Sequence, residues 1–157
     1  MSVKDELLAA LAPIVTAVEE LVLDDEEAAT LYLTERFPLD GALLVQVRTL
    51  LRAGIEDGSL CDRENAGVRF SRLKKAVGDE AAIDLVHMHG PGPGHLHPRG
   101  EVDLCFAVSG QPRFDGRTQG FTVYKPGSWH VPTVDGGEMD IIYFLPGGAI
   151  TFGPPAA

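Results

Sequence analysis

The hydrophobic pattern of this 157-residue chain changes near residue 76, and this change constrains the fold more than any other feature. Before this point, apolar residues recur at the three- and four-residue spacing of amphipathic helices. After it, they form short segments separated by glycine and proline. We therefore expect an α+β protein in two parts, with a helical N-terminal segment over residues 1–75 and a β-rich part over residues 76–157.

Three helices are expected in the first part. One apolar stripe runs from Val3 to Val22 and predicts the first helix. The acidic cluster at residues 24–27 predicts the start of the second, because carboxylates there interact favourably with the helix dipole. The third is expected from an N-cap at Asp40 to near Gly58. The acidic cluster is therefore interpreted as a solvated helix start and not as a metal or partner site.

The second part reads as short strands. Gly-Pro-Gly-Pro-Gly at residues 90–94 predicts a rigid loop; it lacks the lysine and the following helix of a phosphate-binding loop. Apolar segments of strand length are found at Ala81–Met88, Val102–Val108, Phe121–Lys125, Met139–Leu145 and Ala149–Phe152. Another candidate strand, Val68–Leu73, precedes the β-rich part.

All five histidines lie between residues 87 and 130. His95 and His97 alternate along a strand, so their rings share one face, and a turn allows Glu101 to approach from the next strand. His130 follows a Pro-Gly turn downstream. Imidazole and carboxylate together suit Fe, Mn, Ni, Cu or Zn, and suit Ca²⁺ or Mg²⁺ poorly. We predict one divalent transition metal bound by His95, His97, Glu101 and His130.

Strand parity adds candidate catalytic residues. Asp103 and Cys105 share the face of Glu101, and Asp103 is predicted either to orient a metal ligand or to transfer protons to the substrate. His89, or His87 beside it in the same parity class, is predicted to face the same cavity and to act in catalysis. The alternative is that both are hydrogen-bonded histidines near a strand end. Cys105 is interpreted as a small core residue.

Two arginines are candidates for substrate binding. Arg99 lies between the predicted metal ligands His97 and Glu101 and is the first choice, and Arg113, which follows the expected β-turn, is the second. A guanidinium at the mouth of the site would pair with a substrate carboxylate in a bidentate manner. The alternative for either residue is an ordinary surface position.

Charge and composition narrow the partners and the location. The net charge of −10 argues against binding to nucleic acid or to anionic membranes. No apolar run reaches the length of a membrane span, and the N-terminus lacks the basic and apolar regions of an export signal. Cys61 and Cys105 are too few for a disulfide framework, which favours a reducing compartment. We expect a cytoplasmic protein that acts on a small molecule.

The predicted ligands lie in two stretches that resemble the two sequence motifs of the cupin family. The resemblance covers roughly residues 80–153 and implies a small antiparallel jelly-roll β-barrel with a metal inside. It departs from the usual pattern in the spacing of four glycine and proline positions and in Val134, where the second motif often has Asn. These departures affect loop lengths and leave the ligands in place. The stretches are Gly90…His95-Leu-His97…Glu101…Gly110 and Gly120…Pro126-Gly127…His130.

The layout of the whole chain is similar to the 4-hydroxylaminobenzoate lyases of bacterial nitrobenzoate breakdown. The similarity rests on a helical half, one short cupin and the run His-Pro-Arg-Gly-Glu-Val-Asp-Leu-Cys at residues 97–105. It implies conversion of 4-hydroxylaminobenzoate to 3,4-dihydroxybenzoate and ammonia. This conversion is redox-neutral, which agrees with the lack of a GxGxxG dinucleotide motif.

Two other functions stay open at this stage. One is an Fe(II)-dependent cupin dioxygenase, which would use nearly the same ligands with open positions for O₂. The other is a cupin that binds a small molecule without catalysis, because one fold serves many functions. In each case a homodimer is expected, since cupins often pair through sheet edges and the apolar helical stripe could contribute to an interface.

Overall fold

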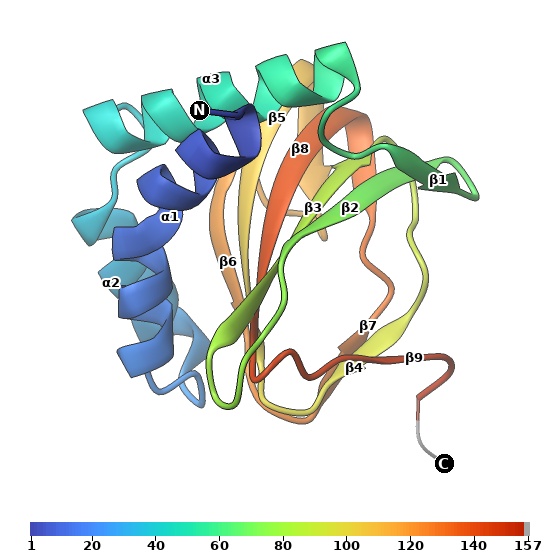
Figure 1. The fold of residues 1–157 in the computed structure, drawn as a ribbon. Coiled ribbons are helices and arrows are strands. Elements are labelled where there is room, and N and C mark those ends of the chain that lie inside the picture. The colour runs from blue at the N-terminus through green and yellow to red at the C-terminus, as the bar shows by residue number, and fades with distance from the viewer. Residues whose placement is uncertain (156–157) are drawn as a thin grey trace.

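The computed structural model describes residues 1–155 and contains three helices followed by nine strands (Figure 1). The helices are α1 (Val3–Glu20), α2 (Glu26–Arg36) and α3 (Ala42–Asp57). The strands are β1 (Arg63–Asn65), β2 (Val68–Lys74), β3 (Ala81–Met88), β4 (His95–His97), β5 (Glu101–Phe114), β6 (Gly120–Tyr124), β7 (Ser128–His130), β8 (Val134–Pro146) and β9 (Thr151–Phe152).

The helix ends follow the local sequence. Ser2 caps α1 by accepting a hydrogen bond from the Asp5 N–H at 3.2 Å. Asp25 caps α2 through the Ala28 N–H at 3.0 Å, so the acidic cluster begins a helix as predicted. The N-cap of α3 is Gly41, one residue later than the predicted Asp40, and no side chain caps this helix. Gly58 ends α3 in the left-handed conformation, with φ of 82°.

Two antiparallel sheets follow the helices. The larger has the strand order β1-β2-β3-β8-β5-β6, and the smaller has the order β7-β4-β9. The helices cover one side of the larger sheet, and β4, β7 and β9 lie across its other side (Figure 1). Strand β5 extends to Phe114, beyond the predicted Val108, and its pairing with β8 shifts register near residues 107–113. The prediction of an α+β protein with a cupin-type jelly roll is confirmed.

The two faces of the larger sheet carry separate cores. Val102, Leu104 and Phe106 of β5 pack toward the helices, in one core with Leu11 and Leu51. Glu101, Asp103 and Cys105 alternate with them and face the inside of the jelly roll, as strand parity predicted. The inner core also contains Val86, Met88, Phe114, Met139, Ile141, Tyr143 and Leu145.

The larger sheet begins before residue 76. The apolar segment noted at Val68–Leu73 forms β2, whose Phe70 pairs with Val86 of β3. A short strand, β1, precedes it and was not predicted, because its three exposed residues Arg63–Asn65 are all polar. The turn between β1 and β2 uses positive φ at Ala66 (51°) and Gly67 (83°), which is typical of a two-residue hairpin. Strands on both sides of the expected boundary at residue 76 therefore belong to one sheet.

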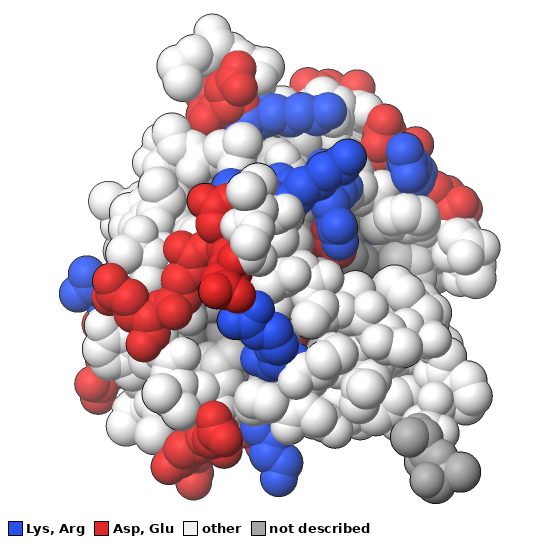
Figure 2. All heavy atoms as spheres, turned by 60° about the horizontal axis from the view of Figure 1, so that its bottom comes forward, with Lys and Arg blue, Asp and Glu red and all other residues white. Residues whose placement is uncertain are grey.

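On the face shown in Figure 2, Lys and Arg side chains lie in separate groups beside acidic ones.

Cys61 and Cys105 are both buried as free thiols, and burial raises the pKa of the Cys61 thiol to about 12. Within residues 1–155, no helix has the length and apolarity required to cross a membrane.

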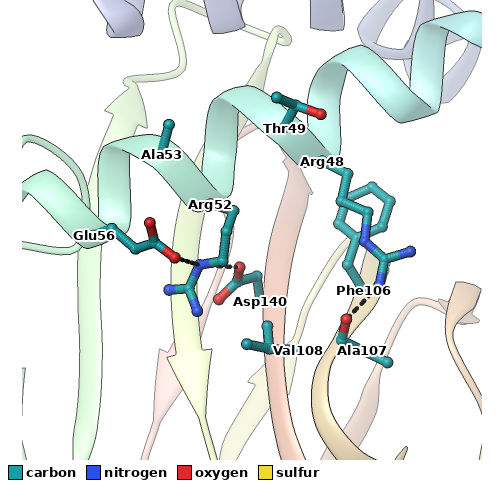
Figure 3. Close-up of a pocket in the computed structure, with 9 residues that line it drawn as sticks. All are labelled: Arg48, Thr49, Arg52, Ala53, Glu56, Phe106, Ala107, Val108 and Asp140. Carbon is teal, nitrogen blue, oxygen red and sulfur yellow. Dashed lines mark hydrogen bonds and ion pairs between the residues drawn. The ribbon is translucent and has the colours of Figure 1, made fainter.

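A polar cluster joins α3 to the sheet on the helix side. His87 Nδ1 lies 2.8 Å from Asp140 Oδ1, and His87 Nε2 lies 3.2 Å from Glu138 Oε1. Arg52 of α3 places its Nε 3.2 Å from Asp140 Oδ2 (Figure 3). A pocket of about 500 Å³ opens beside this pair, between α3 and strands β5 and β8, and its lining includes Arg48 and Phe106. His87 therefore faces the helices, and the expectation that it faces the metal cavity is corrected.

This cluster makes part of the stability depend on pH. The hydrogen bond to Asp140 is the main cause that raises the pKa of His87, against the opposing effects of burial and Arg52. The imidazolium thus stabilises the fold fully below its unfolded pKa of about 6.5, and this contribution is lost as pH rises through the higher folded pKa. We expect His87→Gln to cost about 1–3 kcal/mol at low pH and less at high pH.

The measurement is urea unfolding of wild type and His87→Gln from about pH 5.5 to about pH 9. A matched control is His89→Gln, because His89 is exposed two residues further along the chain. A stability difference that stays constant or grows with pH would contradict the assigned charge state of His87.

Candidate metal centre

Three short elements bring the four predicted ligands together inside the jelly roll. His95 and His97 occupy both ends of β4, and His130 of β7 pairs directly with His95. Glu101 begins β5 after the turn that follows β4. His95 Nε2 is 3.4 Å from Glu101 Oε1, and His97 Nε2 is 3.2 Å from Glu101 Oε2. One ligand atom from each of the four residues lies within 4.8 Å of the others.

The other ring nitrogens of His95 and His97 are held by neighbouring oxygens. His95 Nδ1 lies 3.1 Å from the carbonyl oxygen of Pro93, which can only accept a hydrogen bond. His97 Nδ1 lies 3.0 Å from Ser128 Oγ, and this hydroxyl already donates to the carbonyl of Lys125 at 2.6 Å. Both Nδ1 atoms therefore donate, which leaves the Nε2 lone pairs directed at the shared position.

His130 is held by a carboxylate from a different part of the chain. Its Nδ1 lies 2.6 Å from Asp115 Oδ2, which also accepts from the Tyr124 hydroxyl. The second oxygen of Asp115 accepts from the Thr133 N–H at 2.9 Å. The hydrogen bonds to His130 and Tyr124 outweigh burial and hold the pKa of Asp115 below its usual value. An ionised Asp115 thus fixes the tautomer and the orientation of His130.

The donor set fits a transition metal. Among residues 1–155, the buried atoms His97 Nε2, Glu101 Oε1 and Glu101 Oε2 have no hydrogen-bond partner. His130 Nε2 and His95 Nε2 lie 3.2 Å apart although both Nδ1 atoms donate elsewhere. Ligand atoms about 2.1 Å from one cation are separated by about 3.0–3.4 Å in octahedral or tetrahedral geometry. The separations of 3.4 Å (His95–Glu101), 3.2 Å (His97–Glu101) and 3.2 Å (His95–His130) match neighbouring ligands of one ion.

Two buried carboxyl groups lie side by side at this centre. Burial would raise the pKa of Glu101, but the adjacent imidazoles of His95 and His97 outweigh it and hold this pKa below the usual range. Burial, followed by the negative charge of Glu101, raises the pKa of Asp103 well above its usual value. Neither oxygen of Asp103 has a hydrogen-bond partner within residues 1–155. The two neighbouring carboxyl groups therefore differ, with the pKa of Glu101 lowered and that of Asp103 raised.

Aromatic rings surround the histidines and restrict access to them. Tyr124 stacks on His97 with ring centres 5.1 Å apart, and Phe152 of β9 lies 5.7 Å from His95. The side chains of His95, His97 and Glu101 are at most 1% exposed, whereas that of His130 is 12% exposed. Of the four ligands, His130 is thus the one that solvent reaches.

Comparison with known proteins identifies the family. The model of the family PnbB, 4-hydroxylaminobenzoate lyase, matches residues 9–152. The chain belongs to this family. A 4-hydroxylaminobenzoate lyase from Nocardioides sp. (strain LMS-CY) is 30% identical over 125 residues, covering 71% of this chain and 74% of that protein. One from Pseudomonas putida is 26% identical over 141 residues, covering 77% and 80%.

Among solved structures, an RmlC-like cupin protein from Ralstonia eutropha JMP134 has a TM-score of 0.44 and 16% identity, covering 57% of this chain and 62% of that one. The family match and the two relatives establish that this protein is an enzyme of the lyase class.

Three residues predicted for the site of this lyase lie apart from the metal ligands. His89 directly follows β3 and is exposed, in the parity class that faces the helices. Arg99 is exposed and pairs with Asp79, with 3.1 Å between Nη1 and Oδ1. Arg113 is exposed and donates to the carbonyl oxygen of Gly116 at 3.3 Å. Of the predicted catalytic residues, only Asp103 is brought to the ligands.

Sequence reasoning missed the groups that orient two of the histidines. Ser128 lies between two recognised residues of the second cupin-like motif, and Asp115 lies outside both motifs. One signal was present: Asp115-Gly116 is a dipeptide that favours a two-residue hairpin, and it does form one, with φ of 48° and 82°. That signal predicts the turn and does not reveal which histidine the Asp115 side chain contacts.

Proposed function

We propose that this lyase binds one divalent transition metal through His95, His97, Glu101 and His130, and that it converts 4-hydroxylaminobenzoate and water to 3,4-dihydroxybenzoate and ammonia. The metal part is supported by the convergence of four ligand atoms within 4.8 Å. It is also supported by the hydrogen bonds that hold the Nδ1 atoms of His97 and His130 and so orient their rings. The substrate part is supported by the family match over residues 9–152 and by two relatives that carry this name.

The observation that carries the proposal is a buried group of metal ligands that lies inside the span matched by the family. Residues 95–130 fall wholly within residues 9–152. A ligand set of imidazoles and one carboxylate suits a Lewis-acidic metal that does not change its oxidation state, as well as redox-active iron. The assignment to a lyase family favours a metal that acts as a Lewis acid without changing its oxidation state.

The proposed reaction balances without an external oxidant. 4-Hydroxylaminobenzoate plus water contains the same atoms as 3,4-dihydroxybenzoate plus ammonia. The N–O bond breaks and accepts the electrons lost by the ring carbon that gains oxygen. The N–O oxygen leaves as water, and one water adds to the electron-poor ring carbon beside the carbon that carries nitrogen. A second water then replaces the nitrogen, which leaves as ammonia, so that one water is consumed overall. A cation held by His95, His97, Glu101 and His130 would supply Lewis acidity to the hydroxylamino group.

Asp103 is the acid–base group in this proposal. Heterolysis of the N–O bond requires a proton at the departing oxygen, and the ring later loses a proton where water has added. The Asp103 carboxyl group is fully buried on the inner face of β5 beside Glu101. Its oxygens have no partner within the described part of the chain, so a bound substrate is free to take that place.

The test is turnover under strictly anaerobic conditions. Purified protein is loaded separately with Fe(II), Mn(II) or Zn(II) and given 4-hydroxylaminobenzoate in ¹⁸O-labelled water. We expect equimolar ammonia and 3,4-dihydroxybenzoate, with label from water in both ring hydroxyl oxygens, because the hydroxylamino oxygen leaves as water and no O₂ enters the balance. Removal of the metal by a chelator should abolish turnover.

The outcomes separate the alternatives. A cupin dioxygenase would stop when O₂ is removed, and product formation that consumes O₂ mole for mole would overturn the lyase reaction. Turnover that survives complete loss of metal would leave the fold assignment intact and reject the metal mechanism. A cupin that only binds a small molecule would give no product with any metal.

A further inference from the structure

A tight turn between β5 and β6 contacts the metal centre directly. Phe114 and Arg117 form an antiparallel bridge, with the Phe114 N–H donating to the Arg117 carbonyl at 2.7 Å and the Arg117 N–H donating to the Phe114 carbonyl at 2.9 Å. The two residues between them, Asp115 and Gly116, have positive φ. Asp115 uses this turn to reach His130 Nδ1 at 2.6 Å. This hydrogen bond therefore links the turn to His130, the partly exposed member of the candidate ligands.

The bridge decides which way the arginines of this turn point. The Phe114 ring is fully buried and lies 6.2 Å from the His130 ring, so Phe114 faces the metal centre. Residues directly opposite one another in an antiparallel pair project from the same face, which places Arg117 on the metal side. Arg113 is adjacent to Phe114 in β5 and opposite the exposed Asp135, so it projects to the other face.

The charge of Arg117 is not neutralised by a nearby carboxylate. Arg117 is exposed, and it forms no ion pair with any residue in the range 1–155. Arg72, which also lies on the inner side of the larger sheet, is held by both oxygens of Asp84 at 2.7 and 3.0 Å. Arg99 pairs with Asp79. Arg117 therefore has a free guanidinium for an incoming anion.

The field of Arg117 reaches the inside of the jelly roll. Burial, and then the negative charges of Asp103, Asp115 and Glu101, raise the pKa of the Cys105 thiol. The positive charge of Arg117 acts on this thiol in the opposite direction and lowers its pKa. An anionic group that enters along the His130 side would thus meet a positive charge before it reaches the buried carboxyl groups.

We propose that Arg117 binds the carboxylate of the aromatic substrate and so determines specificity for hydroxylaminobenzoates over uncharged arylhydroxylamines. This inference rests on the proposed function for the identity of the substrate. A para-substituted benzoate carries its carboxylate and its hydroxylamino group at opposite ends of the ring. Such a substrate spans from a cation at the mouth to the reacting oxygen at the centre, and the guanidinium offers a bidentate pair of donors.

The test compares wild type, Arg117→Gln and the matched control Arg113→Gln, which removes a charge from the outer face of the same hairpin. Turnover is measured with 4-hydroxylaminobenzoate and with phenylhydroxylamine, which lacks the carboxylate. We expect Arg117→Gln to lower kcat/KM for the benzoate about 10- to 100-fold and to reduce the preference for it by the same factor. Arg113→Gln should keep the wild-type preference.

Calorimetric binding of benzoate gives a second measurement that does not depend on the reaction. Benzoate should bind wild type and Arg113→Gln alike and bind Arg117→Gln about 10- to 100-fold more weakly. Unchanged preference and unchanged benzoate affinity in Arg117→Gln would overturn the inference while leaving the lyase reaction intact. Conversely, Arg117-dependent benzoate binding in a protein that does not convert 4-hydroxylaminobenzoate would reject the proposed function and retain the carboxylate site.

Discussion

Replacement of His97 by alanine is expected to empty the metal site and to lower turnover by about 10³-fold or more, because the Lewis acid is worth several kcal/mol of transition-state stabilisation. The His97 side chain is fully buried. Its Nε2 is directed at the other ligands, and its Nδ1 is held by Ser128. Alanine removes one of the four predicted ligand atoms, and none of the other three residues in the group can replace it. Metal content should fall from about one equivalent to below about a tenth.

Metal analysis of the purified variant and its circular dichroism spectrum check this result. His89→Ala is the matched control, because His89 is exposed and projects away from the ligands. It should retain a full equivalent of metal. If His97→Ala keeps a full equivalent while the sheet signal is unchanged, the assignment of the four ligands fails.

Substitution of Asp103 by asparagine is expected to lower kcat about 10²- to 10⁴-fold while the metal stays bound. Asparagine has nearly the shape of aspartic acid but cannot deliver or accept the proton that the proposed reaction moves. Asp103 itself contributes no ligand atom to the group of His95, His97, Glu101 and His130. The loss should therefore appear in kcat and in the pH profile, with little change in metal content.

Asp84→Asn is the control for this variant, since Asp84 also lies on the inner side of the sheet and pairs with Arg72. Its kcat should stay within a few-fold of wild type. Two outcomes would count against proton transfer by Asp103: full activity in Asp103→Asn, or a loss of activity that is matched by loss of metal. The second outcome would assign Asp103 the orienting role that strand parity also allowed.

The amino-acid sequence by itself was sufficient to predict the helices, most of the strands and the candidate ligand set. Helical periodicity and acidic N-terminal residues are local properties, and they predicted the two helices that are observed at residues 3–20 and 26–36. The strand Ala81–Met88 was predicted with its observed bounds, because its continuous apolar residues are bounded by turn signals. The candidate ligand set could be predicted because three imidazoles and a carboxylate at these spacings have few other uses in a chain with five histidines, and the structure brings these four side chains together.

Only the tertiary structure decided which sheet face became the site. A period of two divides strand residues into two classes but does not say which class the helices will cover. In this fold the helices cover the face that carries Ile83 and Leu85. His87 lies on the same face, so its side chain points toward Arg52 and Asp140 and away from the metal centre. The partner of His130 was decided in the same way: Asp115 reaches it because the β5–β8 register and a two-residue turn bring residues 15 positions apart into hydrogen-bond contact. Such contacts depend on strand pairing across the whole jelly roll, which no local pattern encodes.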